Sequence, residues 1–180
     1  MLLVQTGQLD AYRENCRKSV ELFGGTTNLV ASHRIAKDCL ILPASGVNLD
    51  SISRMVDASM AEGQNVNNRW FQCCKGLADY RQNHFTRAAD WMTTVLTNGG
   101  SFLEVDTTAY MVLAMSQWRL QHIEQARAAL AAGTEAEQKL GRLDSGNLGE
   151  EWIDWIIAES LMREAKALIE GDVRAGGQPK

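Results

Sequence analysis

The sequence predicts an all-α fold of antiparallel helix pairs, closed by a C-terminal capping helix. Residues that favour helices are abundant among the 180, and only 2 are proline. Apolar residues recur at helical spacing, and no long segment shows the Val/Ile/Thr alternation that is typical of strands. Hydrophobic residues make up 45%, which favours a folded chain over a disordered one.

An internal repeat defines the predicted pairs. The segments 75–96 and 113–134 match when one is moved along the chain by 38 residues. Each has a small residue, an aromatic before a tight turn, a large apolar residue after the turn, and Ala three residues later. These residues are Gly76, Tyr80, Phe85 and Ala88 in one unit, and Ala114, Trp118, Ile123 and Ala126 in the other. Asn83 suits a left-handed position in the turn, and Gln121 suits it less well.

The same frame extends to the start of the chain. Gly7 falls on Asn83 and Leu9 on Phe85, which predicts that the chain opens at the end of a first helix. We interpret this as a fragment of a longer polypeptide. The unit at 28–62 is looser because the loop after Pro43 is longer, so its register against the other units stays open by several residues.

Capping patterns predict where further helices begin. Ser101 with Glu104 forms a capping box, Thr134 with Glu137 predicts a short helix, and Asn147 with Glu150 precedes a final helix. The predicted helices are 9–23, 29–42, 49–61, 69–81, 85–96, 102–120, 123–131 and 150–169. They form one domain over 1–170, with repeats at 1–24 (partial), 28–62, 69–97 and 102–132 and a capping helix at 150–169, followed by a flexible tail at 171–180.

Charge and hydropathy exclude several partners. The net charge is −4 without a long run of one sign, which argues against nucleic acid and against a polybasic membrane anchor. Residues 1–4 are too short for the apolar region of a signal peptide, and no stretch approaches the roughly 18 to 20 apolar residues of a membrane span. The expected location is cytoplasmic.

Motifs of catalysis are absent from the sequence. It has no Gly-rich phosphate loop, no kinase motif and no Gly-x-Ser-x-Gly element, so we expect neither an enzyme nor a cofactor. Carboxylates such as Glu159 and Glu164 are interpreted as solvated helix residues, since nothing selects an acid/base pair. His84 and His122 occupy equivalent turns far apart, so a surface position is expected and a metal site is not.

The four cysteines fit neither a zinc nor a redox spacing. Cys16, Cys39, Cys73 and Cys74 lie among apolar helical residues, which predicts free thiols in the core. A disulfide between the adjacent Cys73 and Cys74 is the rarer alternative.

The repeat residues given above resemble those of the tetratricopeptide repeat family. The resemblance covers about four-fifths of the chain. The sequence departs from the family in its period, which exceeds the usual ~34 residues, and in lacking Pro after the second helices. The segment 151–169 is also similar to the last helix of repeat regions appended to bacterial serine/threonine protein kinases, which implies a regulatory region of a larger bacterial signalling protein.

The resemblance implies that first helices line a concave, partner-binding face. The residues carried over are Trp70, Cys73, Leu77, Tyr80, Met111, Met115 and Trp118, extended by His33 and Lys37. Such a Met-rich apolar groove suits an apolar helix or peptide. The carboxylate clamp of chaperone-binding members is absent, because apolar residues and cysteines stand at its positions. Packing between neighbouring helices is the competing interpretation, equally weighted for Leu77 and Met115.

The predicted function is therefore a non-catalytic protein–protein interaction scaffold that binds a protein or peptide. The alternative is self-association as a homodimer through the apolar residues Leu2, Leu3 and Leu9 at the open end of the array. Trp91, Trp152 and Trp155 are expected to pack between helices, whereas Trp70 and Trp118 lie on first helices, where contact with a partner is favoured.

Overall fold

The structure is a computed structural model that describes residues 2–60, 68–99, 102–140 and 152–176. These ranges contain helices and connecting turns and no strand, which confirms the predicted all-α class. The described helices are α1 (Leu2–Gln5), α2 (Leu9–Phe23), α3 (Leu29–Leu40), α4 (Leu49–Met60), α5 (Arg69–Arg81), α6 (Phe85–Thr97), α7 (Leu103–Arg119), α8 (Ile123–Leu140) and α9 (Trp152–Gly176).

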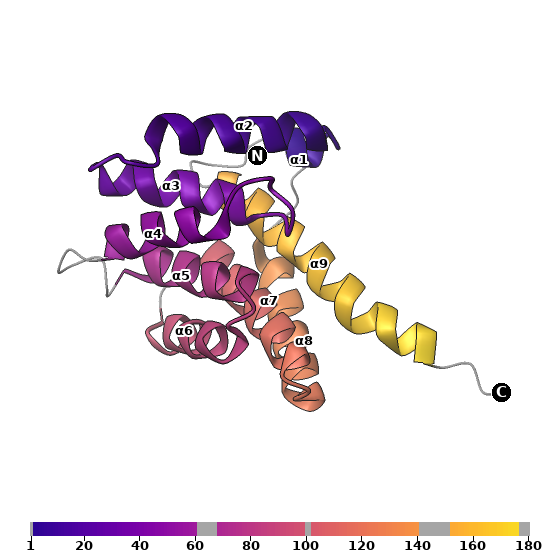
Figure 1. Cartoon of the computed structure of the whole chain (residues 1–180). Helices are drawn as coiled ribbons and strands as arrows, with labels where there is room; N and C mark the ends of the chain where they lie inside the picture. Colours follow the sequence, from indigo (N-terminus) through magenta and orange to yellow (C-terminus); the bar gives the residue numbers. More distant parts are fainter. Residues whose placement is uncertain (1, 61–67, 100–101, 141–151, 177–180) are drawn as a thin grey trace.

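The first eight helices form four consecutive pairs that stack into a helical-repeat array (Figure 1). Each second helix contacts the first helix of the next pair, as α4 does with α5 and α6 with α7. The first helices α3, α5 and α7 also contact one another in series. The long helix α9, yellow in Figure 1, runs beside this stack and packs mainly on α7 and α8, as expected of a cap on the last pair.

Three turns of similar geometry recur at intervals of 38 residues or twice that number, in agreement with the predicted repeat. Gly7, Asn83 and Gln121 have φ angles of 71°, 63° and 65°. In each turn the next residue donates its backbone N–H to the carbonyl oxygen five residues earlier, at 2.8 Å for Gln8 and 2.9 Å for His84 and His122. Such a left-handed residue ends one helix and reverses the chain. The loop between α3 and α4 is longer and has Gly46 at φ 78°, which explains the looser register of that unit.

Close approach between paired helices explains the small residues of the repeat. A Cβ placed on Gly76 of α5 would lie 3.0 Å from Cβ of Trp91 and 3.4 Å from the carbonyl oxygen of Ala88, both on α6. Ala88 and its counterpart Ala126 are fully buried. Helix packing at this distance leaves no room for longer side chains.

Two predicted helix ends are wrong by more than a few residues. Helix α8 does not stop at 131 and no separate helix begins at Thr134, because the hydroxyl of Thr134 donates to the carbonyl oxygen of Leu130 within one continuous helix. Gly133 does not end the helix; it allows close contact with α7, since a Cβ there would lie 2.7 Å from Cβ of Tyr110. Helix α9 continues to Gly176, so residues 171–176 are helical rather than part of a tail.

Smaller differences concern helix starts and the second pair. Helix α3 ends at Leu40, two residues before the predicted end, and α4 ends at Met60. The predicted caps at Ser101 and at Asn147 with Glu150 lie outside the described residues. Helix α7 begins after Phe102, whose side chain makes no capping hydrogen bond. Within the described part of the chain, none of the helices combines the length and apolar character that crossing a membrane requires.

Candidate interaction site: the concave face beneath helix α9

Helix α9 lies on the surface that the first helices of the pairs form, which we call the concave face. It packs on α7 and reaches α1, α3 and α5 through hydrogen bonds and ion pairs. The predicted binding residues all belong to α3, α5 and α7, and five of the nine line spaces next to α9. The chain thus places one of its own amphipathic helices where a partner helix was expected.

Four predicted site residues line a small cavity together with α9. Lys37, Trp70, Cys73 and Leu77 meet α9 at Asp154 and Ile157, around a space of about 20 Å³. His33 lies beside Lys37 and Trp70 in a neighbouring surface depression of about 220 Å³ that also reaches Asp154. The structure therefore brings five of the nine predicted residues together at the N-terminal part of α9.

The other four predicted residues do not line these spaces. Met111 is fully buried and its terminal methyl lies against Gly133 of α8, within the last pair. Met115 is also fully buried, and Tyr80 packs against Phe85 with ring centroids 5.7 Å apart. Trp118 is half-buried against the core. For these residues the structure supports packing between helices.

An ion pair joins α3 to the start of α9. The Lys37 ammonium lies 2.5 Å from a carboxylate oxygen of Asp154, and both side chains are largely buried. The same ammonium lies 5.3 Å from the ring centroid of Trp70, within the range of a cation–π contact. Lys37 is thus positioned by an aromatic ring of the array and neutralised by a carboxylate of α9.

A second, more buried pair joins α5 to α9. Arg81 binds Glu164 with two parallel hydrogen bonds of 2.5 and 2.8 Å, and its side chain is only 3% exposed. Arg81 also donates to the carbonyl oxygens of Leu40 and Ile41 at the C-terminal end of α3, at 2.8 and 2.7 Å. Helix C-termini carry partial negative charge, which stabilises a cation there. The guanidinium is therefore fixed by the array itself and presents a bidentate face to a carboxylate.

A polar contact also connects α9 to the first pair. Gln5 of α1 donates to Glu159 at 2.9 Å and accepts a hydrogen bond from Arg163 at 2.9 Å. Helix α9 therefore makes polar contacts with α1, α3 and α5. These contacts give the helix a defined register on the concave face.

The thiols and the imidazole of this face are poor candidates for chemistry. Burial raises the pKa of the Cys73 thiol and raises the pKa of Cys74 to about 12, so both thiols stay protonated. Burial, together with the nearby Lys37, lowers the pKa of His33 to about 4, so the ring is neutral at pH 7. Its Nε2 lies 3.2 Å from the carbonyl oxygen of Trp70 and its ring stacks on Phe71.

Metal and disulfide chemistry receive no support from the described residues. Cys16, Cys39, Cys73 and Cys74 are all free and buried, as predicted for core thiols. Among the described residues, no group of three or more His, Cys, Asp or Glu side chains could hold a metal ion. His84 and His122 are exposed at equivalent turns of separate pairs. What the site offers is a shaped surface with fixed cations, which is suited to recognition.

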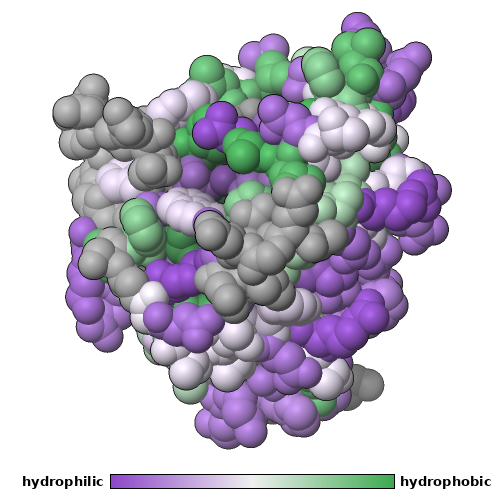
Figure 2. Space-filling view, turned by 90° about the vertical axis from the view of Figure 1, so that its left-hand side faces the viewer, coloured by the Kyte–Doolittle hydropathy of each residue, from purple (hydrophilic) through white to green (hydrophobic). Residues whose placement is uncertain are grey.

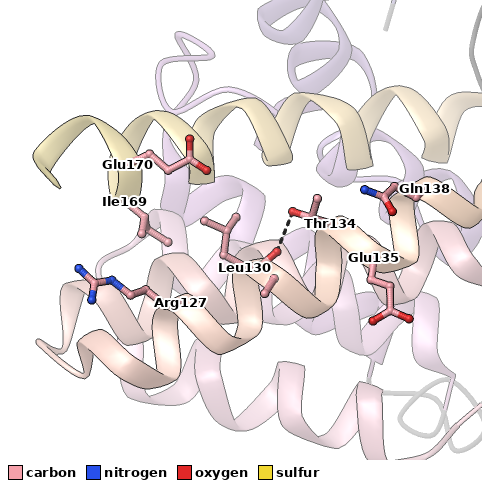
Figure 3. Close-up of a pocket in the computed structure, with 8 residues that line it drawn as sticks. Arg127, Leu130, Thr134, Glu135, Gln138, Ile169 and Glu170 are labelled. Atoms are coloured by element: carbon pink, nitrogen blue, oxygen red, sulfur yellow. Dashed lines mark hydrogen bonds between the residues drawn. The ribbon is translucent and has the colours of Figure 1, made fainter. Parts of the chain in front are cut away.

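A wide crevice separates α8 from the C-terminal part of α9 (Figure 3). It has a volume of about 690 Å³ and is lined by the buried Leu130 and Ile169 and by polar residues. In Figure 3 the Ile169 side chain points from α9 towards Leu130. The polar lining residues are Arg127, Thr134, Glu135, Gln138 and Glu170. Helix α9 is therefore not packed tightly against α8 along its whole length.

The prediction that Glu164 is a solvated helix residue is wrong, because Glu164 faces the array and binds the buried Arg81. On a helix, Asp154, Ile157, Leu161, Glu164, Ala165 and Leu168 fall within an arc of about 100°. Two carboxylates on an otherwise apolar face are a detectable signal of buried cationic partners. Arg81 has no signal in the sequence beyond its place at the end of a predicted helix, because its partners Leu40, Ile41 and Glu164 come from other elements.

Neither a family model, nor a curated protein, nor a solved structure matches the chain. The functional argument therefore depends on the fold and on the geometry of the concave face.

Proposed function

We propose that this chain is a non-catalytic scaffold for protein–protein interaction, of the tetratricopeptide type, whose concave face binds a helical segment of a partner. The observation that carries the proposal is that this face already accommodates an amphipathic helix, α9, with ion pairs at Lys37 and Arg81. Helix-in-groove recognition likewise places the apolar face of an amphipathic helix in an apolar groove. A regulatory repeat region of a larger bacterial signalling protein in the cytoplasm is the setting that the sequence resemblance favours.

Site-specific photo-crosslinking tests this function. A photoreactive amino acid replaces Trp70, at the edge of the concave face, and in a matched variant it replaces Asp90, an exposed residue of α6. After irradiation in cells that express the chain, we expect a defined protein adduct from position 70 and none from position 90. Equal adducts from both positions, or adducts from position 90 alone, would contradict the proposal.

Self-association is the second candidate, and a specific surface favours it. Leu22, Phe23 and Val30, around the end of α2 and the start of α3, are exposed by 72%, 48% and 53%. Figure 2, which views the side of the molecule that lies to the left in Figure 1, shows several hydrophobic areas on that face. Leu2 and Leu9 are also exposed, at 60% and 40%. Exposed apolar side chains at one end of a repeat array suit stacking against a second copy.

Molar mass by light scattering decides between a monomer and a dimer. If self-association is the function, the chain has twice its monomer mass and the variant Leu22→Gln, Phe23→Gln returns it to a monomer. A monomer at all concentrations removes this candidate and leaves the scaffold proposal untouched.

A further inference from the structure

The concave face is built to receive carboxylates, and this feature indicates the chemistry of its partner. Arg81 is held by the carbonyl oxygens of Leu40 and Ile41, so its position does not depend on α9. Lys37 is held over the ring of Trp70. Two fixed, largely buried cations therefore belong to the array, and each requires an anionic partner when it is covered.

Helix α9 supplies these anions from two positions ten residues apart. Asp154 and Glu164 are separated by about 15 Å along a helix at 1.5 Å per residue. Between them Ile157 and Leu161 are 2% and 0% exposed. A helix that binds this face must therefore present an aliphatic stripe with one carboxylate at each end, spaced to meet Lys37 and Arg81.

The contacts that hold α9 belong to the array. Lys37 and Arg81 are fixed on α3 and α5, and the apolar surface between them contacts Ile157 and Leu161 of α9. A separate helix that presents the same pattern of carboxylates and aliphatic residues can therefore make the same contacts as α9.

We propose that α9 is a resident occupant of the concave face, and that the physiological partner is an acidic amphipathic helix that replaces it. This inference rests on the proposed scaffold function and names the partner's chemistry and its regulation. A tethered helix competes at a high effective concentration, so a partner binds weakly until α9 is released. Helix α9 thus sets a threshold for partner binding and keeps the apolar face covered until then.

Peptide binding to the full-length chain tests the inference. The probe is a fluorescein-labelled peptide with the sequence of residues 152–171, and the readout is fluorescence anisotropy. The variant Asp154→Asn, Glu164→Gln weakens α9 and leaves Lys37 and Arg81 available. We expect it to bind the peptide at least about tenfold more tightly than the parent chain does.

Three controls make the result specific. The variant Asp90→Asn, Glu124→Gln removes the same number of carboxylates from exposed positions on α6 and α8, and it is expected to bind like the parent. A peptide carrying Asn and Gln at the positions of Asp154 and Glu164 is expected to bind the variant chain no more tightly than it binds the parent chain. A scrambled peptide of the same composition is expected not to bind. Equal binding by the two chain variants, or by the scrambled peptide, overturns the inference.

Hydrogen exchange on the parent chain gives a second test that needs no variant. If α9 is a replaceable occupant, its amides exchange through a local opening that is faster than the opening of α5 and α7. If α9 exchanges only when the whole molecule unfolds, it is a permanent part of the fold and the inference fails. Photo-crosslinking at position 70 still reports on the scaffold function in that case, so the two failures are distinguishable.

Discussion

Two residues that are not glycine hold left-handed backbone positions in the repeat turns. Asn83 and Gln121 have φ angles of 63° and 65°, whereas the equivalent position of the first pair is Gly7. Asn tolerates this conformation better than most residues do, because its short side chain bonds locally. Gln has no such advantage, so the turn at Gln121 carries backbone strain of about 1 kcal/mol.

Replacing Gln121 by Gly should stabilise the chain. Removal of the strain offsets the greater freedom of glycine in the unfolded chain, and we expect a net gain of up to about 0.5 kcal/mol in the free energy of unfolding. Urea denaturation measures the change. The control Gln138→Gly, at an exposed position within α8, should instead lose about 1 kcal/mol. Stabilisation by both substitutions would show that the turn is not strained.

His33 makes the stability depend on pH in a defined window. Its pKa falls from 6.5 to about 4 in the folded chain because the ring is buried and lies near Lys37. Between these values the unfolded chain binds the proton more readily than the folded chain does. Above pH 6.5 the titration of His33 does not lower the free energy of unfolding. As the pH falls from 6.5 towards 4, the free energy of unfolding decreases.

The expected loss through His33 is about 2 to 3 kcal/mol over this window. The variant His33→Gln keeps a donor for the carbonyl oxygen of Trp70 but does not titrate, so its stability should fall less. The difference in the free energy of unfolding between the two chains isolates the effect of His33 from that of Asp38. The raised pKa of Asp38 makes the chain more stable as the pH falls, which is opposite to the effect of His33. Parallel pH profiles for both chains would show that His33 is not the titrating group.

At the scale of a helix pair, the small residues of the repeat set the distance between partners. Ala88 is fully buried where α5 and α6 meet, beside the position of Gly76. The substitution Ala88→Leu should overpack this contact and cost about 1 to 3 kcal/mol. Ala128 is exposed on α8, and Ala128→Leu should change the melting temperature little. If the two variants melt alike, the assignment of Ala88 to the close contact is wrong.

The pair formed by Arg81 and Glu164 should dominate the polar binding of α9. Glu164→Ala leaves a guanidinium that is 3% exposed without its carboxylate, which should cost about 2 to 4 kcal/mol in the free energy of unfolding. Glu159 contacts Gln5 and, at 3.8 Å, the exposed Arg163, and it is itself 36% exposed, so Glu159→Ala should cost less than about 1 kcal/mol. Equal losses in chemical denaturation would mean that Arg81 is solvated in solution.

The repeat was predictable because local chemistry defines it. Gly7, Asn83 and Gln121 stop helices through backbone geometry that depends on neighbouring residues alone, and the spacing of Gly76 and Ala88 reflects one helix pair. The end of α8 was not predictable in this way, because Gly133 serves contact with α7 and does not stop its own helix. The sequence alone does not distinguish a glycine that ends a helix from one that allows close contact between two helices.

The candidate site was only partly predictable for a related reason. On its array side, the family resemblance put Lys37, Trp70, Cys73 and Leu77 on first helices, and these four residues line one small cavity in the structure. Its other side comes from α9, more than 70 residues later in the chain than Cys73 and outside the repeat. The pairing of Arg81 with Glu164 depends on how α9 docks, and no periodicity in the sequence specifies that docking.

For the whole molecule, α9 decides whether the concave face is covered. Its residues Ile156, Ile157, Leu161 and Ile169 are at most 3% exposed, and burying each contributes about 1.5 to 3 kcal/mol before entropy costs. Truncation after Gly149 should therefore lower the melting temperature and cause aggregation, since the total stability of a domain is about 5 to 15 kcal/mol. Scanning calorimetry with light scattering measures both effects. A peptide of residues 152–171 added in trans should partly restore the melting temperature, because replacement covers the face that deletion leaves bare. A truncated chain that stays a soluble monomer with the parent's melting temperature would show that α9 contributes nothing to the fold.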